Sequence, residues 1–421
     1  MASLSHVSIF SAAANLCLPP VSSHRARRVP CCLPTNQQPN EPATDLRVVF
    51  AGGGTGGHIY PAIAIADELK NKSPETLILF VGTPKSMESA AVRSAGYNFA
   101  SIRSPPLARP LFSPKNLFLP LRLVKSLIRS YKILREFEPQ IVVGTGGYVS
   151  FPLCLAAALK GITLVIQEQN AFPGIANWVL SYFANLVFVA FNSTLNSFPK
   201  HKCLVCGNPI RLSLKRDISK AEARSYFFPK LEESERAAPG AKVVLVLGGS
   251  IGANSINIAM LNLYYEILME NENLFIIWQT GVESFNEMDS LVRNHPHLLV
   301  RPFLKSMDLA YAAADLLVSR AGAMTCSEIL ATGKPAILIP SPNVAEGHQF
   351  RNASLMADLA GSRIIREDEL DSITLKSAIE ELLGNEDQLT VMSERALKAA
   401  KPNASAEIVE RILSLVTSSA N

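Results

Sequence analysis

The 421-residue sequence lacks several features that would point to particular classes of protein. No run approaches the roughly eighteen uncharged apolar residues that a membrane-spanning helix needs, and the best candidate is interrupted by Lys160. No Asp-x-Asp string indicates a metal site, and we interpret Glu367-Asp368-Glu369 as a solvated turn. The net charge of +4 is too small to indicate nucleic-acid binding. We therefore expect a soluble or peripheral protein that uses no metal and no cofactor and binds no nucleic acid.

The cysteines do not indicate a metal site either. Cys203 and Cys206 have the two-residue spacing of metal and redox motifs, but no second Cys or His pair stands at a matching distance. We interpret them as two cysteines of an apolar strand. With Cys154 and Cys326 they form an even set that is compatible with disulfides, although a large enzyme in a reducing compartment needs none.

Acidic residues are absent from the first forty positions, which contain several serines and the basic run from His24 to Arg28. This composition is typical of an organelle transit peptide, and Met1-Ala2-Ser3 favours a plastid one. A secretory signal is the alternative, but no Lys or Arg precedes the first apolar run. We expect residues 1–45 to be a disordered transit peptide, and the mature protein to reside in the plastid (chloroplast).

What the sequence does contain is a strand, a glycine-rich turn and a helix in direct succession. The apolar run after Arg47 leads into Gly-Gly-Gly-Thr-Gly-Gly-His, and a helix is predicted from Ile59 to Lys72. Such a turn presents backbone N–H groups and a helix N-terminus to an anion, which favours a phosphate ligand. His58 closes the turn, where an acid or base would lie beside the bound group. The next strand, Leu77 to Val81, ends without the carboxylate that a dinucleotide site requires.

The same succession returns in the second half, where the apolar run from Lys242 to Leu247 precedes Gly-Gly-Ser-Ile-Gly-Ala and a helical stretch from Asn254. Two such openings in a chain that is 48% hydrophobic predict two doubly wound α/β domains, each with its own core. Other apolar strands alternate with helices, as in parallel sheets, at Ile141–Val143, Thr163–Ile166, Leu186–Val189, Cys203–Val205, Phe275–Thr280, Leu298–Phe303, Leu316–Ser319 and Ala336–Ile339.

Unusual residues gather in the loops that follow these strands, and such loops share one edge of a parallel sheet. Gly144–Tyr148 is a further glycine turn, Gln167–Asn170 is polar, and Arg211 supplies a guanidinium near the junction of the two halves. The stretch from Ser319 opens a helix with N–H donors and hydroxyls. Glu328, one turn inside that helix, is placed to bind the ribose hydroxyls of a nucleotide whose diphosphate meets the helix start. An ordinary carboxylate near a positive dipole end is the alternative.

Seven strings occur in order along the chain: Gly-Gly-Thr-Gly-Gly-His, Gly-Thr-Gly-Gly-Tyr-Val-Ser, Glu-Gln-Asn, Gly-Asn-Pro-Ile-Arg, Gly-Gly-Ser-x-Gly-Ala, Arg-Ala-Gly-Ala-Met-Thr-Cys-Ser-Glu and His-Gln-Phe-Arg-Asn-Ala. From about residue 46 to the C-terminus the chain thus resembles the bacterial peptidoglycan glycosyltransferases that add N-acetylglucosamine to lipid I. The resemblance implies a glycosyltransferase B fold, with two Rossmann-like domains facing across a cleft. It also implies a metal-independent, inverting reaction with UDP-N-acetylglucosamine as donor.

In this fold we expect residues 46–211 to form the acceptor and membrane-facing domain, and residues 212–400 to bind the UDP-sugar. A C-terminal helix at about 402–418 is expected to complete the first domain. His58 resembles the general base that takes a proton from the acceptor hydroxyl. The other residues that the resemblance implies contact sugar, diphosphate, ribose or uracil: Thr55, Gly56, Gly57, Asn170, Arg211, Ser250, Leu304, Ala323, Met324, Thr325, Cys326, Ser327, Glu328 and Gln349.

The chain departs from the family mainly on the acceptor side. Gln167 stands where the family usually has histidine, Ile251 stands where glutamine is frequent, and the loop Arg103–Pro110 has no glycine. The implied acceptor is a polyprenyl-diphosphate lipid that carries a muramyl peptide. Two alternatives remain: a related plastid transferase that puts galactose on diacylglycerol, and a non-catalytic protein that binds a nucleotide sugar or a lipid.

Residues 107–135 hold seven Lys or Arg and no acidic residue, with Leu, Phe and Ile throughout. A basic apolar stretch of this kind suits the headgroup region of an anionic membrane. We expect this segment to hold the protein on an internal plastid membrane. The alternative is an amphipathic helix that packs on the sheet and has a solvated basic face.

Overall fold

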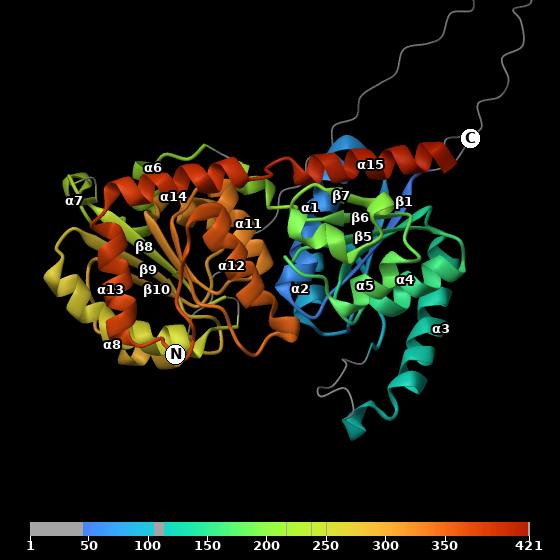
Figure 1. Cartoon of the computed structure of the whole chain (residues 1–421), viewed down its shortest axis with the longest axis horizontal. Coiled ribbons are helices and arrows are strands. Elements are labelled where there is room, and N and C mark those ends of the chain that lie inside the picture. Colours follow the sequence, from blue (N-terminus) through green and yellow to red (C-terminus); the bar gives the residue numbers. More distant parts are fainter. Residues whose placement is uncertain (1–44, 105–112, 216, 237, 250, 420–421) are drawn as a thin grey trace, which may run out of the picture. The chain divides into compact units, whose positions relative to one another are not determined.

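A computed structural model of the protein describes residues 45–104, 113–215, 217–236, 238–249 and 251–419 (Figure 1). Two parallel sheets contain all the strands of these ranges, in the orders β3-β2-β1-β4-β5-β6-β7 and β10-β9-β8-β11-β12-β13. The strands are β1 Arg47–Gly52, β2 Leu77–Gly82, β3 Asn98–Ser101, β4 Ile141–Gly146, β5 Thr163–Glu168, β6 Leu186–Val189, β7 Cys203–Val205, β8 Lys242–Leu247, β9 Leu274–Gln279, β10 Leu298–Arg301, β11 Leu316–Ser319, β12 Ala336–Leu338 and β13 Arg363–Ile364. The two doubly wound α/β domains predicted from the sequence are confirmed.

Helices connect the strands and cover both faces of each sheet. The α-helices are α1 Gly56–Lys72, α2 Met87–Ser94, α3 Leu119–Phe137, α4 Ser150–Leu159, α5 Ile175–Ser181, α6 Lys220–Phe227, α7 Glu233–Arg236, α8 Asn254–Glu270, α9 Phe285–Leu291, α10 Met307–Ala313, α11 Ala323–Thr332, α12 His348–Ala360, α13 Ser372–Leu383, α14 Glu386–Ala399 and α15 Ala404–Ser419. We call β1–β7 with α1–α5 and α15 the first lobe, and β8–β13 with α6–α14 the second lobe. No helix in the described ranges is long and apolar enough to cross a membrane.

The central strand β1 shows why its sequence is apolar throughout. Val49 and Ala51 point into the core beneath α3, α4 and α5, whereas Val48 and Phe50 point to the opposite core with α1 and α2. Successive strand residues face opposite sides, and both sides are covered, so no polar alternation is possible. Strand order reverses between β1 and β4, and likewise between β8 and β11 in the second lobe. Such switch points are where ligands bind in doubly wound sheets.

The last helix, α15, packs in the first lobe although it follows the whole of the second lobe (Figure 1). Its buried residues Ile408, Val409 and Ile412 belong to the same core as Phe50 and Ile59. These three positions recur at the i, i+1, i+4 spacing that places side chains on one helix face. The first lobe therefore contains both ends of the described chain.

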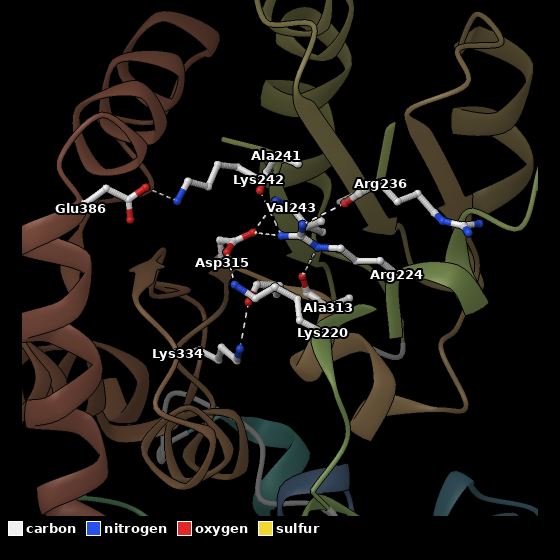
Figure 2. Close-up of polar contacts among 11 residues, drawn as sticks. Lys220, Arg224, Arg236, Ala241, Lys242, Val243, Ala313, Asp315, Lys334 and Glu386 are labelled. Atoms are coloured by element: carbon white, nitrogen blue, oxygen red, sulfur yellow. Dashed lines mark hydrogen bonds and ion pairs between the residues drawn. The ribbon is translucent and has the colours of Figure 1, made fainter. Parts of the chain in front are cut away.

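A buried ion cluster joins α6 to the sheet of the second lobe, as Figure 2 shows. The Asp315 carboxylate accepts hydrogen bonds from Lys220 Nζ, Arg224 Nη2 and the backbone N–H of Val243, each at 2.7 Å. Lys334 Nζ lies nearby and donates to the carbonyl of Ala314 (2.9 Å). Burial, together with the positive charge of Lys220, lowers the pKa of Lys334 to about 8.

Candidate active site

The two glycine turns of the first lobe lie against each other at the switch point. Gly147, at the end of β4, has φ +81, and a Cβ there would lie 2.1 Å from the carbonyl oxygen of Gly53. Only glycine allows this approach. The helix α1 begins at Gly56, three residues before the predicted start at Ile59. His58 thus lies in the first turn of the helix.

The ring of His58 is held in one orientation by its neighbours. Nδ1 lies 3.0 Å from the carbonyl oxygen of Thr145 and 3.0 Å from Oε1 of Gln169. The amide of Gln169 is fixed in turn, because its Nε2 donates to Thr145 O (2.8 Å) and to Gln167 O (3.1 Å). Nδ1 therefore faces two acceptors and carries the proton, which leaves the lone pair on Nε2. This tautomer can accept a proton from a substrate hydroxyl at Nε2.

Thr55, Gly56 and Gly57 surround His58 at the start of α1. Thr55 is the N-cap residue, but its side chain makes no capping hydrogen bond, and the first turn holds no acidic residue. His58 N–H donates to the carbonyl of Thr55 (3.2 Å), so the backbone N–H groups of Gly56 and Gly57 remain for a ligand or water. The structure thus brings these three residues and His58 together in a single turn.

Glu168 organises the polar loop after β5, and the sequence interpretation gave it no role. Its side chain is buried, and its two oxygens accept four hydrogen bonds. Oε1 accepts from the backbone N–H and the Nδ2 of Asn170, each at 3.0 Å. Oε2 accepts from the backbone N–H of Gly174 (3.1 Å) and from Asn177 Nδ2 (2.8 Å). The carboxylate therefore fixes the orientation of Asn170.

Asn170 also contacts the second lobe through Asn352 of α12, another residue without a predicted role. Asn352 Nδ2 donates to Asn170 Oδ1 (3.3 Å), and Asn352 Oδ1 accepts from the backbone N–H of Ala171 (3.0 Å). Gln349, one turn earlier in α12, accepts from the backbone N–H of Ser341 through Oε1 (2.8 Å). Its Nε2 donor makes no hydrogen bond to the described residues. The side chain of Asn170 is thus held at Nδ2 by Glu168 and at Oδ1 by Asn352, whereas Gln349 is held at Oε1 and presents its Nε2.

His348, the first residue of α12, is a second titratable group in this region that has no predicted role. Its Nε2 lies 2.9 Å from Oε2 of Glu346. Burial lowers the pKa of His348, while the charges of Glu168 and Glu346 oppose that shift and His58 adds to it. These influences identify His348 as an electrostatic neighbour of His58.

Arg211 and Glu328 form one ion pair between the end of the first lobe and α11. Arg211 Nε lies 3.6 Å from Glu328 Oε1, and the Tyr311 hydroxyl donates to Glu328 Oε2 (2.9 Å). The guanidinium also lies over the ring of Tyr60, 4.8 Å from its centroid. Burial raises the pKa of Glu328, and both Arg211 and the Tyr311 hydrogen bond oppose this. Each group predicted to meet the nucleotide is therefore engaged by the other.

The remaining predicted residues differ in burial: Met324 and Thr325 are partly exposed, whereas Ala323, Cys326 and Leu304 are buried. Ala323, Met324 and Thr325 form the first turn of α11, whose N-cap Gly322 provides no side-chain hydrogen bond. Cys326 and Leu304 instead point into the core of the second lobe, and burial raises the pKa of Cys326 to about 12. Their predicted contacts with the ligand stay predictions, and the structure adds that both side chains are buried.

Ser327 is turned towards the junction of the lobes, where its hydroxyl accepts from Asn208 Nδ2 (2.9 Å). Ser250 lies outside the described residues. The cysteines at 154, 203, 206 and 326 are free. Within the described ranges, no group of three His, Cys, Asp or Glu side chains could hold a metal ion. Residues 367–369 form a turn in which Asp368 and Glu369 are exposed, as predicted, while the partly exposed Glu367 also pairs with Arg320.

Comparison with known proteins agrees with this geometry over most of the chain. Residues 48–189 match the Glycosyltransferase family 28 N-terminal domain, and residues 243–411 match the Glycosyltransferase family 28 C-terminal domain. The chain is 42% identical over 374 residues to the UDP-N-acetylglucosamine--N-acetylmuramyl-(pentapeptide) pyrophosphoryl-undecaprenol N-acetylglucosamine transferase of Christiangramia forsetii, covering 88% of this chain and 98% of that one. The transferase of the same name from Salinibacter ruber is 40% identical over 368 residues, with 87% and 96% covered.

Solved structures show the same fold. The crystal structure of Acinetobacter baumannii MurG superposes with a TM-score of 0.66 at 28% identity, covering 88% of this chain and 99% of that one. The calicheamicin glycosyltransferase CalG4 superposes with a TM-score of 0.61, and at 17% identity it supports the fold alone. The family matches, the relatives and the two facing sets of helix N-termini and polar loops lead to one conclusion: the chain belongs to glycosyltransferase family 28.

Proposed function

We propose that this protein transfers N-acetylglucosamine from UDP-N-acetylglucosamine to an N-acetylmuramyl-pentapeptide linked through diphosphate to a polyprenyl lipid. The names of its relatives describe this reaction, and the family assignment supports it. The observation that carries the proposal is the position of His58 Nδ1 against two oxygen acceptors, which favours the tautomer whose lone pair is on Nε2 at the glycine turn.

In the proposed reaction His58 Nε2 takes the proton from the acceptor hydroxyl as that oxygen attacks the anomeric carbon. The new C–O bond forms on the face opposite the departing UDP, so the configuration inverts. The bond between the anomeric carbon and the diphosphate oxygen breaks, and its electron pair leaves on UDP. The Thr145 carbonyl and Gln169 Oε1 then stabilise the imidazolium through Nδ1–H.

The leaving diphosphate needs positive charge, and three features of the chain supply it. Helices α8 and α11 both begin without a side-chain cap or an acidic first turn, so their N–H groups are available to phosphate oxygens. Arg211 contributes a guanidinium that is partly buried beside Glu328. These groups can stabilise the charge that develops on UDP.

The test is turnover with the lipid-linked muramyl pentapeptide and labelled UDP-N-acetylglucosamine. We expect His58→Ala to lower turnover by about a hundredfold or more, with donor affinity nearly unchanged, because a general base acts only in the transition state. His201→Ala, at an exposed site, is the matched control. Near wild-type turnover of His58→Ala would make His58 structural.

The same assay separates the two alternatives. If the protein instead transfers galactose from UDP-galactose to diacylglycerol, the proposed donor and acceptor are both wrong. A non-catalytic protein would bind UDP-N-acetylglucosamine and form no product with any acceptor.

The proposed acceptor lies in a membrane, and α3 offers a surface for reaching it. Leu117, Phe118, Leu121, Val124 and Ile128 are each more than half exposed at and before this helix. Arg122, Lys125 and Arg129 are exposed on the same helix. Apolar side chains flanked by cations suit the headgroup boundary of an anionic bilayer. Residues 107–112 of the predicted segment lie outside the described residues.

The compartment we propose is the plastid, with the protein peripheral on an internal membrane. The support is the composition of residues 1–45, which contain one acidic residue near their end at Glu41 and another at Asp45. Residues 1–44 lie outside the described residues, so this proposal depends on the sequence alone.

A further inference from the structure

A hollow of about 250 Å³ lies where the chain crosses between the two lobes, away from the glycine turns. It is lined by the end of β6, the segment after β7, the inner faces of α11 and α12, and the link between α14 and α15. Most of its wall is apolar, and the larger side chains are Phe191, Val205, Ile210, Leu330, Leu355 and Leu359. An apolar hollow at a domain junction is a common place for a small ligand.

Two cations stand at this hollow, Lys398 at the end of α14 and Lys401 in the link that follows. Both side chains are exposed, and neither lies within 4.0 Å of a carboxylate oxygen among the described residues. The backbone at this point is tightly packed, because a Cβ on Gly207 would lie 2.3 Å from Cβ of Lys401. The stem of Lys401 is thus packed against the backbone of Gly207, while the exposed ammonium groups of both lysines are available to an anion.

The hollow continues along α12 into a second, wider one of about 630 Å³. Ser193 and Leu355 line both, so the two form one groove. Phe350, which is half exposed, lies at the far end. A chain-like ligand therefore has a path from the lysines past Leu355 towards Phe350, apolar in the first hollow and bordered by Glu346, Arg351 and Asp358 in the wider one.

We propose that this groove binds an amphiphile with one alkyl chain and one anionic head group, of the class of a medium-chain fatty acid. The carboxylate pairs with Lys398 and Lys401, and the alkyl chain lies against Leu330, Leu355 and Leu359. The two lysines at one end and the mostly apolar lining of the first hollow fit this class better than a neutral lipid or a small inorganic anion.

A ligand in the groove would lie next to a hydrogen bond that connects the groove to α11, the helix that carries Glu328. Asn208 and Ser327 both line the groove, and their hydrogen bond (2.9 Å) joins the segment after β7 to α11. A bound alkyl chain beside this bond biases how the junction packs against the helix that carries Glu328. The binding itself does not depend on the proposed transferase activity.

The test is calorimetric titration of the full chain with dodecanoate below its micelle concentration, and with dodecanol and butyrate as probes without the charge or the long chain. We expect saturable one-to-one binding of dodecanoate, about fivefold weaker binding of dodecanol since two exposed ion pairs are lost, and no measurable butyrate binding. Equal affinity for dodecanoate and dodecanol would overturn the charged end of the site.

Two variants fill the groove from positions that are not fully buried, Ser193→Trp and Ala331→Phe. Each should weaken dodecanoate binding by about tenfold or more, since the apolar contact area is lost. Asn196→Trp, on the same short helix as Ser193 but outside the groove, is the matched control. Melting curves check that all three variants fold.

The exposed face of α3 is the competing site for an alkyl chain. Dodecanoate affinity that is unchanged in Ser193→Trp and Ala331→Phe, yet lost in Leu121→Ser with Ile128→Ser, would place the ligand there and overturn the proposal. Turnover measured with and without dodecanoate then reports separately whether occupancy affects catalysis.

Discussion

At the scale of single residues, the pairing of Arg211 with Glu328 determines what each can do for a nucleotide. Both groups are predicted donor contacts, and each holds the other in place 3.6 Å away. We expect Glu328→Ala and Arg211→Ala each to weaken UDP binding by about 1.5 to 3 kcal/mol, the range for hydrogen bonds to charged groups. Calorimetry with UDP measures this, and unchanged affinity in both variants would move the nucleotide elsewhere.

A stability measurement is the necessary control for these two variants. Removing one partner of a fully buried pair destabilises a fold by about 3 to 5 kcal/mol, because the other charge is left uncompensated. The cost should be smaller here, because the Arg211 side chain is 30% exposed. Tyr311→Phe removes only the hydroxyl that donates to Glu328 Oε2 and keeps both charges. A loss of UDP affinity larger in Arg211→Ala than in Tyr311→Phe therefore reports the charge rather than general loosening of α11.

The sequence could predict which residue types lie near the ligand, but not how they are oriented. Cys326 and Leu304 were predicted contacts, yet their side chains are buried in the second-lobe core. A string match carries no information on which face of a short helix points inwards. Gln169 also received no role from the sequence. Its role depends on contacts with Thr145 and His58, and these residues come together only in the fold.

Lys334 should make the stability of the fold depend on pH, and the shift of its pKa gives the direction of that dependence. Its folded pKa of about 8 lies below the ordinary value of 10.5, so between these limits the unfolded chain binds more protons. Stability should therefore rise as the pH increases from about 8 towards 10.5, because the penalty of a buried ammonium is relieved. Lys334→Met should lack this rise, and Lys230→Met, at an exposed site, should retain it. Denaturant titrations across this range measure the difference, and parallel curves for wild type and Lys334→Met would contradict it.

At the scale of elements, α3 combines a buried side with an exposed apolar and basic one. Ile133 and Leu134 pack in the first-lobe core near its end, so the helix is anchored while its start remains exposed. We expect the protein to bind anionic vesicles, more weakly as salt rises, and more weakly again in Arg122→Glu, Lys125→Glu and Arg129→Glu combined. Each basic group near such a surface contributes about 1 kcal/mol.

A charge-matched control for α3 is available in the second lobe. Lys230→Glu, Lys305→Glu and Arg363→Glu change the net charge equally at exposed positions. Vesicle binding that falls equally in both triple variants, or that does not depend on salt, would leave α3 as an ordinary helix of the first lobe.

The first and last residues of most buried strands could be predicted from the sequence, whereas those of edge strands and of strands that end in glycine turns could not. Strand β8 was predicted at its observed residues, because both faces of it are covered and its residues are apolar after Lys242. Strand β4 instead extends through Gly146, since it pairs with β1 as well as β5 even where its residues are glycines. The two-residue β13 pairs only with β12, and nothing in its own residues distinguishes it from a loop.

At the scale of the whole molecule, the sequence carries an expectation about where the chain goes after synthesis. If residues 1–45 are a transit peptide, a fluorescent reporter fused behind them should enter plastids and be shortened there by cleavage. A variant in which Arg25, Arg27 and Arg28 are changed to Glu should stay outside, because such peptides depend on basic residues and exclude acidic ones. A cytosolic reporter with the unchanged peptide would remove the plastid assignment.

The return of α15 to the first lobe has a consequence for the order in which the chain can fold. Ile408, Val409 and Ile412 complete the core that contains Phe50 and Ile59, so that core stays open until α15 has been synthesised. Sequence-distant contacts of this kind delay folding, because the intervening chain must be ordered before they form. A nascent chain that lacks only α15 can already close the sheet of its second lobe, while its first lobe still exposes an apolar groove to chaperones. A chain that is released before α15 has been synthesised therefore keeps an exposed apolar surface on its first lobe, even when its second lobe has folded.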